Sequence, residues 1–237
     1  MVKLYFIRHG RQNSGLCNVD VPLDDAGIRQ AELVAKRLEL YNINKLYCSN
    51  LIRARETAEI IGKNLGLQPI IEEDFREISF GDMEGLDGAQ LKERFGDFIE
   101  ERKKAKEDIP NPGGESGEDV FNRAMPIIRR IIEEAIENTI AEAKDDVIEK
   151  AKEVGREKNQ KNIAIVTHGG LIRSVLAGVL EAPFAKKLCI GKDLENCSIT
   201  EINFDEETGN FIVERVNDYA HIEVEPELLR KYFKKSL

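Results

Sequence analysis

The sequence predicts an α/β protein in which a doubly wound, mainly parallel sheet carries helices on both faces and a long helical insertion. Two observations lead to this fold class. Short apolar runs typical of buried strands alternate with amphipathic stretches of helical spacing. In addition, 41% of the 237 residues are hydrophobic, and a chain of this length can bury most of its surface without covalent staples. We therefore expect a single domain spanning residues 1–237.

The chain begins with a predicted strand and a predicted helix. Lys3–Ile7 is short, apolar and aromatic, which favours a buried strand. Asp24 is a candidate N-cap, because its carboxylate can accept a hydrogen bond from a free amide of the first helical turn. The apolar stripe of the helix that follows consists of Ile28, Ala31, Ala35 and Leu38.

A second strand, helix and strand are expected next. Ile43–Cys48 is the predicted strand, and Ser49 and Asn50 are expected to cap the helix behind it. That helix is expected to end near Gly66, since glycine adopts the left-handed conformation that terminates helices. Pro69–Ile71 is a short third strand. The apolar stripe of the helix consists of Leu51, Ala54, Ala58 and Ile61.

Residues 86–160 are predicted to form a helical insertion, or cap, within the domain. Its longest part is a helix over Ser116–Glu157, whose start fits a capping box with Asp119. An unbroken helix of this length would reach about 60 Å at 1.5 Å per residue. Because that exceeds the diameter of one domain, the helix either breaks near Asn138 and Thr139 or projects. Its apolar stripe begins with Val120, Ala124, Ile127, Ile131 and Ala135.

The remaining part of the chain predicts three strands and two helices. Asn162–Thr167 has the clearest pattern of a buried strand, and Leu171–Leu180 is expected to be the helix behind it. Ser198–Phe204 and Phe211–Val216 are typical of a hairpin. Pro226–Leu237 is expected to be a small basic amphipathic helix or a frayed tail.

The charge balance restricts the classes of partner. Lys and Arg number 35, whereas Asp and Glu number 44, which gives a net charge of −9. Binders of nucleic acid or of membrane surfaces usually present a basic face, so we expect neither partner. No run approaches the ~18 apolar residues of a membrane helix, and the first apolar run is too short for a signal peptide. We therefore expect a cytoplasmic protein.

The cysteines indicate neither disulfides nor a metal cluster. Cys17, Cys48, Cys189 and Cys197 are scattered along the chain without metal-ligand spacing. Free thiols in a reducing compartment are the expected state. We expect no metal and no cofactor.

Arginine and histidine side chains follow the predicted strands at their carboxyl ends, where ligands bind in sheets of this kind. His9 and His168 each stand directly before glycine, which allows a ligand to approach the backbone amides closely. Arg8 precedes one of them, and Arg53 lies in the first turn of the helix after the second strand. Guanidinium forks of this kind match the oxygens of a phosphoryl group. His221 lies in the tail and is interpreted as a partly exposed structural residue.

Seven blocks of the sequence resemble, in order, the histidine phosphatase superfamily (phosphoglycerate-mutase-like), and within it the phosphatase branch. The resemblance covers nearly the whole chain except residues 132–162, and seven ordered blocks are far more specific than one Arg-His-Gly. The blocks are Leu4–Gly10, Pro22–Gly27 with Gln30 and Ala31, Ser49–Ala54 with Thr57 and Ala58, Arg76–Glu77 with Gly81, Glu84 and Gly85, Pro112–Ser116, Thr167–Gly170 with Ile172 and Arg173, and Asn196–Ile199.

The resemblance implies a role for each matching residue. His9 would be the nucleophile that forms a phosphohistidine, and Glu77 would donate a proton to the leaving oxygen and then activate water. Arg8, Arg53 and His168 would hold the phosphoryl oxygens and the charge that develops on them. A neutral imidazole can attack phosphorus at pH 7 without a separate base, which suits this role.

One position departs from the family pattern. Many members carry an Asn six residues after the nucleophile, where this chain has Gly15. Asn13 and Asn18 are nearby and either can take its place, and Gly169 is a further candidate for contact with substrate. Arg11 is expected at the pocket mouth as a solvated residue or as a site for a second anion. Glu84 is expected to be structural or to support the site from behind.

Several functions are compatible with these residues. We expect a metal-independent phosphomonoesterase that hydrolyses small phosphorylated metabolites, because the segment Phe75–Gly81 lacks the pattern of the mutases. A cofactor-dependent phosphoglycerate mutase is the alternative. A non-catalytic phosphate-binding module is a third candidate, although binding alone does not require Glu77. The long predicted helix also allows self-association as a homodimer. The sequence does not identify the phosphomonoester.

Overall fold

The computed structural model describes residues 1–149, 161–191 and 193–233. Six strands form one sheet in the order β3-β2-β4-β1-β5-β6. The first four of these pair in parallel, whereas β5 and β6 are antiparallel. The sheet is thus mainly parallel, as predicted, with a hairpin at one edge. The strands are β1 Val2–Arg8, β2 Lys45–Ser49, β3 Ile70–Glu72, β4 Lys161–Thr167, β5 Ile199–Phe204 and β6 Phe211–Asp218.

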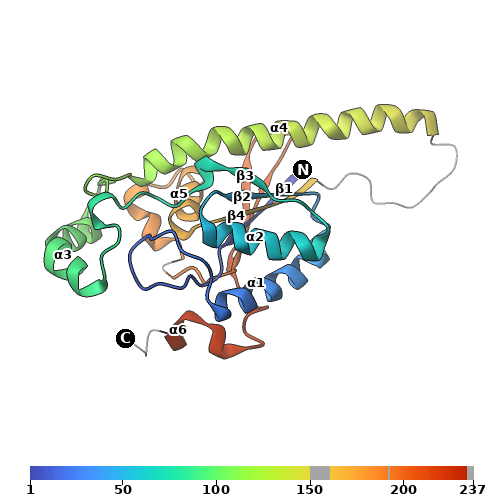
Figure 1. The fold of residues 1–237 in the computed structure, drawn as a ribbon. Coiled ribbons are helices and arrows are strands. Elements are labelled where there is room, and N and C mark those ends of the chain that lie inside the picture. Colours follow the sequence, from blue (N-terminus) through green and yellow to red (C-terminus); the bar gives the residue numbers. More distant parts are fainter. Residues whose placement is uncertain (150–160, 192, 234–237) are drawn as a thin grey trace.

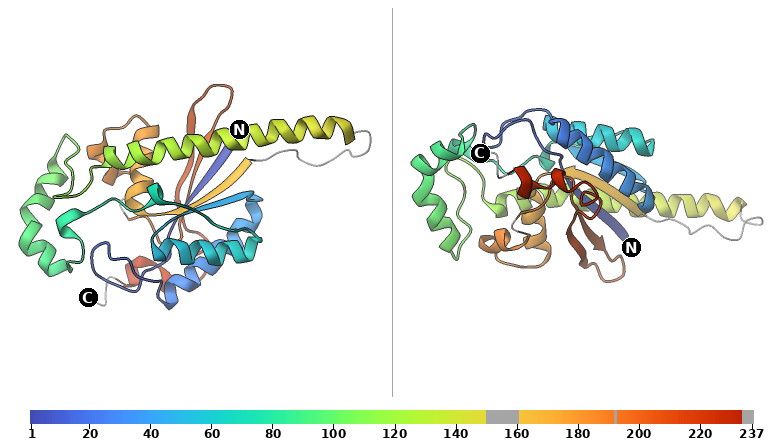
Figure 2. Two further views of the ribbon diagram at one scale, coloured as in Figure 1. Left: turned by 45° about the horizontal axis from the view of Figure 1, so that its top comes forward. Right: turned by 90° about the horizontal axis from the view of Figure 1, so that it is seen from below.

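Helices cover both faces of the sheet, as Figures 1 and 2 show. One face carries α1 (Asp25–Leu38) and α2 (Ile52–Leu65), and the other carries α4 (Gly117–Glu149) and α5 (Gly169–Val179). Successive side chains of a strand point to opposite faces. For this reason Leu4 and Phe6 of β1 belong to the core under α4 and α5, whereas Tyr5 and Ile7 belong to the core under α1 and α2.

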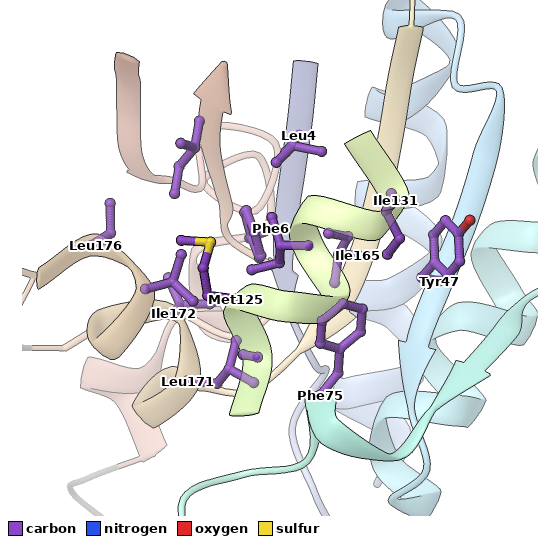
Figure 3. Close-up of a cluster of buried hydrophobic side chains, with 14 of the residues drawn as sticks. Leu4, Phe6, Tyr47, Phe75, Met125, Ile131, Ile165, Leu171, Ile172 and Leu176 are labelled. Carbon is purple, nitrogen blue, oxygen red and sulfur yellow. The ribbon is translucent and has the colours of Figure 1, made fainter. Parts of the chain in front are cut away.

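The core under α4 includes residues from distant parts of the chain, and Figure 3 shows it in close-up. Met125 and Ile131 of α4 face Phe6 of β1 and Ile165 of β4, and all four are nearly inaccessible to solvent. Phe75, from the segment after β3, closes the same cluster. Burial of such side chains contributes roughly 1.5–3 kcal/mol each, so α4 is anchored to the sheet by its N-terminal half.

Helix boundaries depend on capping, and two predicted caps form. Asp24 accepts a hydrogen bond from the amide of Gly27 at the start of α1. Ser116 and Asp119 form the predicted reciprocal capping box at the start of α4. Gly66 ends α2 with φ +71°. The prediction that Ser49 and Asn50 cap α2 is wrong, because the cap residue is Leu51 and makes no side-chain cap hydrogen bond.

Two predicted stripes need correction in detail. Ile28 of α1 is 42% exposed, because it lies at the edge of the helix face that packs on the sheet. In α4 the fully buried residues include Ile128 and Ile132, whereas Ile127 is only half-buried.

Helix α5 begins at Gly169, two residues before the predicted start, since His168 already serves as its N-cap.

The predicted insertion contains α3 (Gly88–Lys104) and α4. Helix α4 runs without a break through Asn138 to Glu149, and its C-terminal part extends beyond the sheet in Figure 1. Residues 150–160, which include the predicted end of this helix, lie outside the described residues. Because the first half of α4 packs in the core, only part of the predicted 86–160 segment is separate from the sheet. Self-association through α4 stays a prediction.

The C-terminal segment folds back on α1. Leu228 and Leu229 are buried in the core under α1 and α2, and Gln30 donates a hydrogen bond of 2.7 Å to the carbonyl of Leu228. The segment ends in the short helix α6 (Arg230–Phe233), and residues 234–237 of the predicted tail helix lie outside the described residues. Within the described chain, no helix is both long and apolar enough to cross a membrane. Single-turn to two-turn 3-10 helices lie at Glu39–Tyr41, Glu73–Phe75, Gly81–Met83, Phe184–Cys189 and Pro226–Leu228.

Candidate active site

The register of the central strands brings the two predicted histidines together. Arg8 at the end of β1 is paired with Thr167 at the end of β4. His9 directly follows β1, and His168 directly follows β4. The two rings therefore lie side by side at the same end of the sheet. Their centroids are 5.0 Å apart. The structure thus places next to each other two residues that are 159 positions apart in the sequence.

His9 has a defined orientation. Its Nδ1 lies 2.7 Å from the carbonyl oxygen of Gly10, a distance at which Nδ1 carries the proton and donates it. The other ring nitrogen, Nε2, then has a free lone pair. The backbone of His9 is held by its amide, which donates to Thr167, and by its carbonyl, which accepts from the side chain of Asn196. The ring is therefore preorganised with one nucleophilic nitrogen.

His168 lies beside His9 and is completely buried. Its Nε2 is 2.8 Å from the hydroxyl of Ser49 at the end of β2. Its Nδ1 is buried and has no hydrogen-bond partner among the described residues. Gly169, which follows it, is also buried within the first turn of α5. Neither residue is among those that line the pocket.

Arg8 and Arg53 both line the pocket and leave a buried donor unused. Arg8 donates through Nη1 to the carbonyl of Leu194. Arg53 donates through Nη1 to Val19 at 3.0 Å and through Nη2 to Asn18 at 2.9 Å. The Nε atoms of both guanidinium groups are buried without a hydrogen-bond partner in the described chain. Because an unpaired buried donor is costly, each of these two atoms favours an anionic ligand near it.

Asn18 is one of the two residues that can replace the family Asn missing at Gly15, and its side chain forms hydrogen bonds with Arg53 and Glu84. Its Oδ1 accepts the hydrogen bond from Arg53, and its Nδ2 donates to the carboxylate of Glu84 at 2.9 Å. Glu84 therefore supports the site from behind, and also accepts a hydrogen bond from the amide of Phe80. Asn13 lines the same pocket but is exposed. Gly15 has open space around it.

Glu77 enters the pocket from the loop after β3 and is fixed at the N-terminus of α5. Its Oε1 accepts hydrogen bonds of 2.9 Å from the amides of Gly170 and Ile78. Arg123 of α4 donates to the carbonyl of Glu77 at 3.1 Å and forms an ion pair with Glu115 at 2.7 Å. Sequence reasoning did not identify Arg123, because an isolated helical arginine has no local signal that links it to this loop.

Burial and positive charge set the protonation of the site. Burial, reinforced by the guanidinium of Arg8, lowers the pKa of His9 well below its usual value. Burial and the neighbouring ring of His9 lower the pKa of His168 in the same direction. Burial, with Arg230 next, lowers the pKa of Arg8 to about 9. Both imidazoles are therefore neutral at pH 7, as a nucleophile must be.

The pocket has a volume of about 680 Å³ and is open to solvent. Four arginines line it, although the protein as a whole carries a net charge of −9. One of them, Arg11, forms an ion pair with Asp24 at 2.9 Å. Asn196 and Arg230 also line the pocket and were not among the predicted site residues. Arg230 reaches it because Leu228 and Leu229 anchor the C-terminal segment, which no local pattern reveals.

The predicted residues thus divide into three groups. His9, Glu77, Arg8 and Arg53 converge on one pocket, and Asn13 lies at its wall. His168 and Gly169 are buried beside it. His221 lies elsewhere and is hydrogen-bonded through Nε2 to the carbonyl of Cys197 at 2.9 Å. In the described part of the chain, no group of three His, Cys, Asp or Glu side chains is arranged to hold a metal ion.

Comparison with known proteins shows which proteins this chain is similar to. The model of the histidine phosphatase superfamily (branch 1) matches residues 4–142 and 138–218. Phosphoglycerate mutase-like protein 4 of Arabidopsis thaliana is 33% identical over 186 residues, which cover 73% of this chain and 69% of that protein. A 2,3-bisphosphoglycerate-dependent phosphoglycerate mutase of Cytophaga hutchinsonii is 31% identical over 182 residues, covering 73% and 75%.

Solved structures with the same fold include phosphatases. Mycobacterial glucosyl-3-phosphoglycerate phosphatase superposes with a TM-score of 0.73 at 26% identity, covering 92% of this chain and 99% of that one. The YhfR protein of Bacillus stearothermophilus superposes with a TM-score of 0.72 at 25% identity, covering 94% and 100%. With paired histidines at neighbouring strand ends and a match over most of its length, this chain belongs to the histidine phosphatase superfamily.

Proposed function

We propose that the protein is a phosphomonoesterase that hydrolyses small phosphorylated metabolites through a phosphohistidine on His9. One observation carries the proposal most strongly. A neutral imidazole with one free nitrogen faces a pocket in which two buried guanidinium groups each keep an unpaired Nε. This arrangement suits a phosphoryl group, whose transfer requires chiefly positioning and charge stabilisation from the protein.

In the first step, Nε2 of His9 forms a bond to phosphorus while the bond from phosphorus to the ester oxygen breaks. Arg8 and Arg53 stabilise the charge on the non-bridging oxygens, which is largest in the transition state. Glu77 gives its proton to the departing oxygen, so the leaving group departs as a neutral alcohol. The ring of His168 packs beside the ring of His9 and is itself oriented by its hydrogen bond with Ser49.

In the second step, a water molecule attacks the phosphohistidine. Glu77, now a carboxylate, accepts a proton from the water as the new oxygen–phosphorus bond forms and the nitrogen–phosphorus bond breaks. Inorganic phosphate leaves, and both His9 and Glu77 return to their initial states. Arg8 and Arg53 supply the positive charge that opposes the phosphoryl group, so we assign no step to a metal ion.

A phosphoglycerate mutase is the second candidate. It is supported by the names of the curated relatives and by the presence of Arg230 in the pocket, because a mutase must hold a second anionic group. A mutase must also exclude water from the phosphohistidine. The pocket here is open to solvent, which favours transfer to water.

Phosphoenzyme trapping tests the proposal. Incubation with a ³²P-labelled phosphomonoester should give an acid-labile, base-stable phosphoprotein. His9→Ala should abolish the label, whereas the matched control His221→Ala should retain it, because His221 lies outside the pocket. Label that persists in the His9 variant would reject His9 as the nucleophile.

Product analysis separates the candidate functions. Phosphate release from p-nitrophenyl phosphate and glycerol 3-phosphate in the presence of a chelator supports a metal-independent phosphatase. Interconversion of phosphoglycerates that depends on added bisphosphoglycerate, without phosphate release, would establish the mutase instead. Phosphate binding with neither reaction would indicate a non-catalytic module.

A further inference from the structure

A second pocket adjoins the phosphate pocket. It has a volume of about 180 Å³ and shares two lining residues, Cys17 and Phe80, with the site described above. The two pockets are therefore neighbours with Cys17 and Phe80 at their common border, so the part of a substrate that lies beyond its phosphate has to pass these two side chains to enter the second pocket. Its remaining lining residues are Met83, Leu91, Phe98, Ile99, Arg102, Lys103 and Leu188.

Helix α3 supplies one wall of this second pocket. The spacing of Leu91, Phe98 and Arg102 places them on one face of the helix, and Ile99 lies beside Phe98 at the edge of that face. The structure describes every residue of α3, and none of them is fully buried. In Figure 1 the helix lies to one side of the sheet and its covering helices. An apolar helix face that the protein itself leaves partly uncovered gains stability when an apolar group covers it.

The charged residues at the rim are already engaged with the protein. The guanidinium group of Arg102 donates to the side chain of Asn111, and burial lowers the pKa of Arg102. Lys103 forms an ion pair with Glu100. Since both cations have partners, the second pocket offers carbon surface for a ligand rather than a second site for an anion.

The volume defines the size of the group that fits. An engineered apolar cavity of about 150 Å³ holds a benzene molecule. A space of about 180 Å³ therefore accommodates one aromatic ring or an alkyl group of roughly six carbons.

We propose that this apolar pocket binds the leaving alcohol of the substrate, so that the preferred substrates are phosphomonoesters whose alcohol carries a ring or a short alkyl chain. The inference rests on the proposed phosphatase function and assigns its substrate class. It places phosphoglycerates, which have no apolar group, among the poor substrates. Each methylene that enters the pocket should raise kcat/KM about fourfold, the ratio that corresponds to ~0.8 kcal/mol per buried methylene.

A homologous series of substrates tests the proposal with the unmodified protein. We expect kcat/KM to rise about fourfold per carbon from methyl phosphate to hexyl phosphate and then to level off when the pocket is full. Benzyl phosphate should be hydrolysed at least as well as hexyl phosphate. A series that is flat from methyl to octyl phosphate, with each ester hydrolysed, would overturn the apolar pocket and leave the phosphatase function intact.

A pair of variants locates the effect on α3. Phe98→Ser should flatten the alkyl series while methyl phosphate is hydrolysed at the wild-type rate, because Phe98 lines only the apolar pocket. Phe95→Ser is the matched control: the same residue type on the same helix, half-buried like Phe98, but not part of the pocket lining. Equal flattening in both variants would show that a general disturbance of α3, rather than this pocket, decides the preference. If no ester gives phosphate and no phosphoenzyme forms, the proposed function itself fails.

Discussion

Gly170→Ala should displace the proton donor without changing the residues that bind phosphate. Gly170 lies in the first turn of α5, and its amide donates a hydrogen bond to Glu77. A Cβ atom added here would lie 2.4 Å from Oε1 of Glu77 and 2.6 Å from Cγ2 of Ile78. Since unstrained contacts of carbon with another heavy atom are about 3.5 Å long, the carboxylate must retreat by about 1 Å.

The magnitude follows from the role of the carboxylate. A misplacement of about 1 Å can cost a catalytic group about 10²-fold in rate, and general acids contribute about 10²–10⁴-fold. We therefore expect kcat/KM of Gly170→Ala to fall about 100-fold for alkyl phosphates, whose leaving oxygen requires a proton. p-Nitrophenyl phosphate has a good leaving group and should be hydrolysed at a rate within about tenfold of the wild-type rate.

Steady-state kinetics with both esters, together with inhibition by inorganic phosphate, measure this effect. Gly15→Ala is the control, because a Cβ atom added at that position would have no other heavy atom within 4 Å. Its rates should stay within a few-fold of wild type for both esters. If Gly170→Ala slows the alkyl and aryl esters equally, or if both glycine variants behave alike, Glu77 does not act as the proton donor.

Three further predictions concern charge and polar contacts. Burial lowers the pKa values of His9 and His168 in the folded protein. As the pH falls below 6.5, the two imidazoles therefore bind protons in the unfolded chain while they are still neutral in the folded protein. The ligand-free protein should therefore lose up to about 1.4 kcal/mol of stability per imidazole between pH 7.5 and 5.5, measured by chemical denaturation. Arg230→Ala should raise KM for phosphomonoesters about tenfold with kcat nearly unchanged, because a charge-assisted contact contributes about 1.5 kcal/mol. Asn18→Ala should lower kcat/KM about tenfold, because Arg53 loses the partner that orients its Nη2.

Each of these predictions has its own control. His9→Asn should remove about half of the pH-dependent loss of stability, and an unchanged loss would show that other groups cause it. Lys231→Ala changes an exposed cation next to Arg230 and should leave KM unaltered. Asn13→Ala removes an exposed amide from the same pocket, and an effect as large as that of Asn18→Ala would contradict the assignment of Asn18.

Much of the fold follows from local pattern. Strands such as Asn162–Thr167 are recognisable because a buried strand needs a short, continuous apolar run, and the structure extends this one by only one residue. The start of α4 is recognisable because Ser116 and Asp119 satisfy each other's amides locally. By contrast, α2 begins with the amide of Ile52 donating to Asp20, a residue 32 positions away. A cap that comes from a distant loop leaves no pattern near the helix it serves.

Some residues of the candidate site were also predictable from local sequence, whereas others were not. Two histidines before glycine at the ends of two predicted strands were sufficient to place His9 and His168 at one edge of the sheet, because parallel strands end on the same side. Asn18 was one of two candidates for the missing family Asn, whereas Arg123 and Arg230 were not identified as site residues. Each reaches the site through a hydrogen bond or a packed segment that joins distant positions, such as the anchoring of the C-terminal segment on α1.

The sequence by itself predicted most of the strands and helices along the chain and, through its resemblance to known motifs, the superfamily. It also predicted the pair of imidazoles with their guanidinium partners, because strand-end position and residue type are local properties. Only the tertiary structure decided that Asn18 holds Arg53, that Arg230 lines the pocket, and that α3 leaves an apolar pocket beside it. Those features depend on how loops and helices pack against one another. Packing of that kind is a property of the whole chain, which no single stretch of sequence encodes.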